Sequence, residues 1–180
     1  SLWSLRRTGD YFGAEFLYDL LPNEIYPYDY DAFQAYTGTF YTVVTNCDSG
    51  EAEYVPVRDM RRDIIYVRAS SSLPLLSRMV EAGGRRYLDG GIADSIPLRR
   101  AEADGCEKNV VVLTRAREYR KGKNRVMFAI RRRYGGYPRL VEAIESRHLR
   151  YNETLDLIRE REAQGRAFVI APSAPVRIGR

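Results

Sequence analysis

The chain has 180 residues, a length that suits one domain with a hydrophobic core. Its composition, with 44% hydrophobic and 29% charged residues and a net charge of +5, is ordinary for a soluble globular protein, and no run of 18 apolar residues exists, which excludes a transmembrane helix. Cys47 and Cys106 form neither a C-x-x-C motif nor a disulfide framework, and a single histidine, His148, excludes a histidine-rich metal site. We therefore expect a cytoplasmic protein without a metal or a cofactor.

The first segment with a clear pattern is helical. Residues 11–21 predict a short helix that stops at Pro22. The tyrosine-rich residues 25–36 follow, and they predict a loop with one or two helical turns that start near Asp29 or Asp31.

A β-hairpin is expected next. Residues 39–47 are rich in β-branched and aromatic side chains and give the clearest strand of the chain. The turn at 48–50 joins them to a second strand, 51–57. Residues 59–80 are expected to be helical in part, with Pro74 at a helix start or break.

The middle of the chain carries a short strand before a glycine pair. Residues 85–88 follow a turn at Gly83-Gly84 and run directly into Asp89-Gly90-Gly91. Pro97 suits the first turn of a helix that reaches about Asp104.

The last part of the chain alternates strands with a long helix. Residues 109–113 form a continuous apolar run, as expected for a strand covered on both faces. Apolar residues at three- and four-residue steps predict a helix over 138–164 that ends at Gly165, and 167–170 predict a last strand. This alternation favours a single three-layer α/β domain over residues 1–180 with a largely parallel sheet.

Positive charge is concentrated between residues 115 and 133. This basic stretch holds nine basic residues and one acid, Glu118. It suits the phosphates of a lipid surface or of nucleic acid, and it equally suits a solvated loop and helix face.

The segment that carries chemistry is Ala69–Leu76 followed by Tyr87–Leu98. Asp89 lies just past a short strand, where functional side chains gather in α/β sheets, and the two glycines beside it leave room for a substrate. It is a candidate general base, although Asp-Gly is also ordinary turn chemistry.

Together, A-S-S-S-L-P and D-G-G-x-x-D-S-x-P resemble the patatin-like phospholipase family. The resemblance implies a three-layer α/β/α fold and a Ser-Asp dyad in which Asp89 is the catalytic aspartate, with Gly90 and Gly91 as the motif's glycines. It implies an ester hydrolase that acts on lipids and needs no histidine between serine and aspartate.

The departure from this family is the nucleophile. No serine in the chain has glycines two residues before and two residues after it, so the G-x-S-x-G elbow is missing, and so is the upstream glycine-rich loop for the oxyanion. In the family both elements precede the Asp-Gly-Gly segment. We therefore expect the chain to be the C-terminal part of a patatin-like domain, with core motifs over 69–98 and the basic and helical region over 115–164, and to be inactive alone.

Other polar candidates are expected to have structural roles. Ser70, Ser71 and Ser72 are expected to cap a helix, as are Asp94 and Ser95 before Pro97. His148 is expected to pack in the long helix or to lie at the surface. The tyrosines from Tyr26 to Tyr41 suit ordinary packing, with an acyl pocket or a membrane interface as alternatives.

The expected partners follow from the resemblance. They are a lipid or acyl-ester substrate and an anionic membrane contacted peripherally through residues 115–133. Nucleic acid is not expected, because no nucleic-acid motif accompanies the basic stretch. An unpaired sheet edge predicts self-association. The alternatives are a non-catalytic scaffold and a module that binds nucleic acid or another anionic surface.

Overall fold

The computed structural model describes residues 13–174 of the chain. These residues form two compact units, each of which is described by itself. The first comprises residues 13–94 and 125–145, and the second comprises residues 95–124 and 146–174. The sequence predicted a single domain over residues 1–180, and this division into compact units does not test that prediction.

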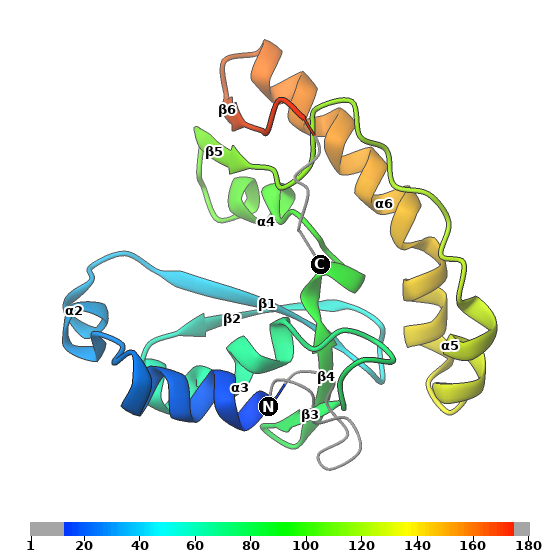
Figure 1. Cartoon of the computed structure of the whole chain (residues 1–180). Helices are drawn as coiled ribbons and strands as arrows, with labels where there is room; N and C mark the ends of the chain where they lie inside the picture. The colour runs from blue at the N-terminus through cyan, green and yellow to red at the C-terminus, as the bar shows by residue number, and fades with distance from the viewer. Residues whose placement is uncertain (1–12, 175–180) are drawn as a thin grey trace. The chain divides into compact units, whose positions relative to one another are not determined.

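The first unit is built on a four-stranded sheet with the order β2-β1-β4-β3. Neighbouring strands are antiparallel throughout. Figure 1 shows β1 and β2 as a long hairpin, which the sequence predicted. The bounds are β1 Phe40–Asn46, β2 Ala52–Val57, β3 Val80–Ala82 and β4 Arg85–Asp89.

Helices cover both faces of this sheet, because its strands alternate apolar side chains between two cores. On one face, Val44 and Tyr87 pack with Ala69 of α3 (Met60–Ser70). On the other face, Leu88 and Cys47 pack with α5 (Met127–Arg133) and the start of α6 (Pro138–Ala163). The first unit is therefore a three-layer α/β/α arrangement, as the sequence predicted.

The helix near the start of the described residues corrects one expectation. Helical structure begins at residue 14 and continues as the π-helix η1, Phe16–Ile25, with Pro22 inside it. The prediction that Pro22 stops the helix was wrong. A proline removes one N–H donor, but the wider i→i+5 turn keeps the chain helical, and the N–H of Tyr26 donates to the carbonyl of Leu21 at 2.8 Å.

A short helix, α2, confirms the reading of the tyrosine-rich stretch. It spans Tyr30–Ala35, and the carboxylate of Asp29 caps it by accepting the N–H of Ala32 at 2.8 Å.

The second unit contains α4 (Leu98–Ala103), β5 (Asn109–Val112), most of α6 and β6 (Ala167–Ile170). Strands β5 and β6 are parallel neighbours, and they pack against the C-terminal half of α6 through Val111, Val169 and Ile158 (Figure 1). The helix ends before Gly165, whose φ of +68° is a conformation that favours a residue without a Cβ.

Two predictions about the sheets were wrong. The larger sheet is antiparallel, because tight turns at 48–50 and 83–84 join strands that must then run in opposite directions; only β5 and β6 are parallel. Strand β5 is also not covered on both faces, since Val110 and Val112 are 68% and 66% exposed. Helix α6 covers one face of this two-stranded sheet, and no described residue covers the other.

None of the helices within residues 13–174 combines the length and the apolar character that crossing a membrane requires.

Candidate active site

Asp89 is the last residue of β4, where the strand gives way to a short 3-10 turn, η2 (Gly90–Ile92). It lies opposite Val44 of β1 in the antiparallel register. Its N–H donates to the carbonyl of Ser72 at 2.9 Å, and its carbonyl accepts the hydroxyl of Thr45 at 2.8 Å. The backbone at Asp89 is therefore tied to the loop after α3 and to the central strand β1.

The side chain of Asp89 is fixed by its own loop. The carboxylate oxygen Oδ1 accepts the N–H of Gly91 at 2.7 Å, and the residue is half-buried. A carboxylate that accepts a backbone N–H has one oxygen held in a defined direction. The predicted aspartate thus lies at a strand end with a fixed orientation, as a general base requires.

Gly90 is required by close backbone contact. A Cβ at this position would lie 2.0 Å from the carbonyl oxygen of Val43, which is backbone that cannot move aside. The carbonyl of Gly90 in turn accepts the N–H groups of Ala93 and Asp94, at 3.2 and 2.9 Å. The first glycine of the predicted motif therefore lets the loop turn directly against β1.

The serine cluster supports this loop. Ser71 and Ser72 lie at the C-terminal end of α3, and their hydroxyls donate to the carbonyls of Val67 and Arg68, each at 2.8 Å. Only Ser71 occupies a cap position, at the C-terminal end of α3, while Ser70 is the last residue of the helix itself. The carbonyl of Ser72 holds the N–H of Asp89. The two sequence motifs, 69–76 and 87–98, thus meet at one hydrogen bond.

A second contact holds the end of the first motif. Leu75 has a positive φ of 68°, and its N–H donates to the hydroxyl of Tyr134 at 3.0 Å. Tyr134 is only 1% exposed. The loop after α3 is therefore pinned to the core beneath α5.

Asp94 has a role other than the expected one. The N-cap position of α4 is Pro97, so the prediction that Asp94 and Ser95 cap this helix was wrong. Asp94 instead accepts the hydroxyl of Tyr54 at 2.7 Å, which joins the end of the Asp-Gly-Gly loop to β2.

Sequence reasoning missed a polar cluster on the same sheet face as Asp89. Glu53 accepts Asn46 Nδ2 at 2.7 Å, Arg85 NH1 at 3.0 Å and the Tyr87 hydroxyl at 2.8 Å. Burial would raise the pKa of Glu53, but hydrogen bonds from Asn46 and Tyr87, with the charge of Arg85, lower it below its ordinary value. Burial and the bond to Glu53 raise the pKa of Tyr87 to about 12. The residues of this polar cluster come from three different strands, so no local sequence motif indicates the cluster.

Much of the basic stretch is used inside the second unit. Arg117 pairs with Glu162 at 2.6 Å, and Arg120 pairs with Asp156, both on α6. The backbone of Lys121 exchanges two hydrogen bonds with the side chain of Asn152, at 2.8 and 3.1 Å. The loop before α5 is thus tied to α6 by its own cations.

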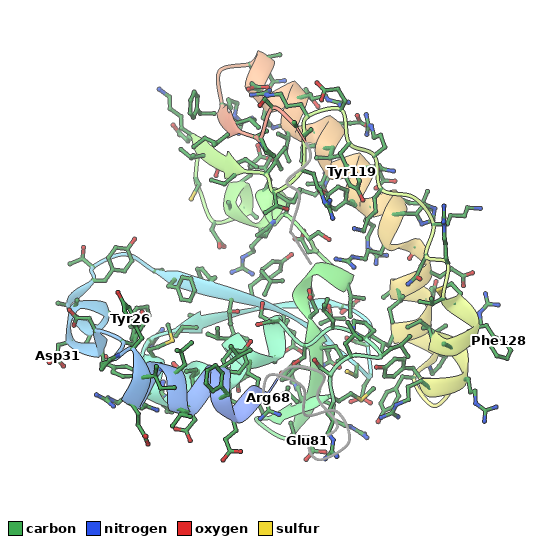
Figure 2. The ribbon with its side chains drawn as sticks, viewed as in Figure 1. Tyr26, Asp31, Arg68, Glu81, Tyr119 and Phe128 are labelled. Carbon is green, nitrogen blue, oxygen red and sulfur yellow. The ribbon has the colours of Figure 1, made fainter. Side chains whose placement is uncertain are left out.

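The tyrosine-rich stretch borders a cavity of about 320 Å³ in the first unit. Tyr26, at the C-terminal cap of η1, is 81% exposed (Figure 2). An acyl-chain role for this stretch stays a prediction. The cavity is lined by Phe33, Gln34, Tyr36, Gly38, Thr39, Phe40, Tyr41, Pro56, Val57 and Arg58.

His148 lies in α6 within the second unit and is half-buried. Its expected packing or surface role stays a prediction.

Comparisons with known proteins place the chain among families. The family model described as Patatin-like phospholipase matches residues 1–102, more than half of the chain and including Asp89. A second model, a domain of unknown function (DUF6363), matches residues 137–180. Among curated proteins, the uncharacterised protein YjjU of Escherichia coli (strain K12) is 37% identical over 78 residues, which are 42% of the chain and 21% of that relative. The match therefore spans about a fifth of the relative's length.

Proposed function

Because the chain belongs to the patatin-like phospholipase family, we propose that the full-length protein is a serine acyl hydrolase that cleaves lipid esters. Asp89 is the general base of a Ser-Asp dyad in this proposal, and Gly90 and Gly91 shape the loop that carries it. The observation that supports this most is the fixed orientation of Asp89, whose N–H, carbonyl and carboxylate each have a partner in the surrounding loops and in β1.

The proposed reaction proceeds through an acyl-enzyme. The serine Oγ attacks the ester carbonyl carbon and gives its proton to the Asp89 carboxylate, while backbone N–H groups hold the oxyanion. Collapse of the tetrahedral intermediate breaks the bond to the alcohol, which leaves with the proton from Asp89. Water then attacks the acyl-enzyme, again with Asp89 as base, and the serine recovers its proton as the carboxylic acid departs.

This chain contributes the aspartate to that reaction, and the serine comes from another part of the full-length protein. The sequence contains no G-x-S-x-G elbow, which is the strained turn that exposes the nucleophilic serine in the family the chain resembles. We accordingly expect the 180 residues alone to hydrolyse no ester. A non-catalytic scaffold is the alternative that the same absence favours.

The proposed setting is the cytoplasm, with peripheral contact to anionic membranes through the region 115–133, since the substrate is a lipid. Nucleic acid is a weaker alternative for this region, because Arg117 and Arg120 are paired with carboxylates of α6.

The exposed apolar face of β5 and β6 supports the expected self-association. Val110, Val112, Phe168 and Ile170 form this face, and each is at least 49% exposed.

A fluorophosphonate probe tests the class of enzyme, because it reacts covalently with an activated serine. We expect the full-length protein to be labelled at one serine outside these 180 residues, and the isolated chain to remain unlabelled. Labelling that is absent from a folded full-length protein would favour the scaffold. The matched sample is the full-length protein preincubated with a lipid ester substrate, which should slow the labelling.

A further inference from the structure

Helix α5 presents an apolar side chain to solvent. Ile130 is 1% exposed, so this residue anchors the helix in the core of the first unit. Phe128 is 83% exposed, and Val126, at the N-cap, is 51% exposed. Figure 2 shows Phe128 on the outer side of α5. Single exposed apolar side chains are common on protein surfaces, so Phe128 supports a contact surface only together with the charges around it.

Arginines surround this ring. Arg132 is one helical turn after Phe128, and Arg125 lies just before the helix. Neither has an ion pair among residues 13–174, whereas Arg131 is bound to Glu145 at 2.7 Å. Arg133 is exposed beside the ring of Tyr134.

The sequence keeps negative charge away from this surface. No acidic residue occurs between Glu118 and Glu142. The next acidic residues along the chain, Glu142 and Glu145, are paired with Arg139 and Arg131. The positive potential around Phe128 is therefore not cancelled locally.

We propose that the α5 surface, formed by Arg125, Phe128 and Arg132 at three- and four-residue steps, docks on an anionic lipid bilayer. The arginines bind lipid phosphates and carboxylates, and Phe128 enters the boundary between headgroups and acyl chains. A nucleic-acid duplex offers phosphates, but it admits a projecting phenyl ring only by unstacking its bases, whereas a bilayer has an apolar layer directly beneath its phosphates. The combination of charge and exposed apolar surface thus favours a bilayer.

This docking surface does not depend on catalysis, because none of its residues takes part in the proposed reaction. It is therefore tested on the 180-residue chain by cosedimentation with vesicles of phosphatidylcholine alone and of phosphatidylcholine with phosphatidylserine. We expect binding to the anionic vesicles only, and weaker binding at high salt.

Variants locate the surface. Arg125→Gln and Arg132→Gln should each weaken binding about fivefold, and Phe128→Ala should weaken it about tenfold. The matched controls are Arg99→Gln and Leu149→Ala, which remove an exposed arginine and an exposed apolar side chain of the second unit and should bind as the wild type does. Circular dichroism verifies that each variant is folded.

Three results would overturn the proposal. The first is equal binding to neutral and anionic vesicles, and the second is loss of binding in the control variants to the same extent. The third is binding to duplex DNA that the α5 variants weaken, without any binding to vesicles, which would make this a nucleic-acid surface.

Discussion

The hydroxyl of Thr45 donates to the carbonyl of Asp89 at 2.8 Å and accepts the N–H of Ala93 at 3.2 Å. One buried side chain of β1 thus holds both the start and the end of the Asp-Gly-Gly loop. Thr45 is 0% exposed, so water does not replace these bonds. The position of the proposed base therefore depends on a residue 44 positions earlier in the chain.

Two substitutions of Thr45 distinguish the contribution of its hydroxyl group to stability from that of its side-chain shape. We expect Thr45→Val to lower the free energy of unfolding by roughly 2 kcal/mol, because the Asp89 carbonyl loses this buried hydroxyl donor and the Ala93 N–H keeps only its bond to the Gly90 carbonyl. Thr45→Ser keeps the hydroxyl and should cost only about 1 kcal/mol for the lost methyl. Urea unfolding measures both values, and amide hydrogen exchange at Ala93 should accelerate in the valine variant alone. Equal exchange in the two variants would contradict this role.

Gly90→Ala tests the close approach of the loop to β1. The new Cβ would meet the Val43 carbonyl at 2.0 Å, so the loop must move. We expect a loss of about 3 kcal/mol in the free energy of unfolding. Gly136→Ala is the matched control, since nothing lies within 4 Å of its Cβ position. A Gly90→Ala variant as stable as this control would mean that the loop is not held against Val43.

Asp63 should make stability depend on acid pH. A hydrogen bond from Arg62 and the N–H groups of Arg58 and Asp59 lower the pKa of Asp63 to about 2 in the folded chain, against 3.8 for an ordinary aspartate. A lowered folded pKa contributes stability above the unfolded pKa and loses it as the pH falls through the folded value. The contribution is about 2 kcal/mol near neutral pH.

The Asp63→Asn variant measures this contribution. Its difference from the wild type in urea unfolding should be largest near neutral pH and should shrink between about pH 4 and pH 2. The exposed Asp31→Asn serves as the control, with little effect at any pH. A difference that stays constant over this range would contradict the assigned pKa.

The two cysteines should differ in reactivity. Burial, with the neighbouring charge of Asp48, raises the pKa of Cys47 to about 12, and its side chain is fully buried. Cys106 is exposed. Because the thiolate is the reactive form, iodoacetamide should modify only Cys106 in the folded chain and both residues in urea, as read by mass spectrometry. Rapid modification of Cys47 in the folded chain would show that the sheet opens readily.

Local patterns predicted the elements that local chemistry determines. The β1–β2 hairpin, the Asp29 cap of α2 and the end of α6 before Gly165 all follow from neighbouring residues, and each is confirmed. The position of Asp89 at a strand end is also confirmed, because a short apolar strand leading into Asp-Gly-Gly is a local signal.

Long-range pairing was beyond the sequence pattern. Nothing near residue 88 indicates that β4 pairs antiparallel with β1, so the larger sheet was wrongly expected to be parallel. Thr45 reads as one β-branched residue among several in its strand, and its bonds to the loop follow only from that pairing. The partners of Glu53 likewise come together only once the strand order is known. Asp94 was misjudged because its partner, Tyr54, lies 40 residues away.

The measurement that tests the central claim most directly is ester hydrolysis by the full-length protein with Asp89→Asn. Asparagine keeps the size of the side chain but cannot accept the serine proton, so we expect kcat to fall at least about a thousandfold with an unchanged fold. Asp48→Asn, at an exposed hairpin turn, is the control and should retain the wild-type rate. Equal rates in the Asp89→Asn variant and the wild type would show that Asp-Gly-Gly is only a turn, and that the chain shares the family's fold without the proposed dyad.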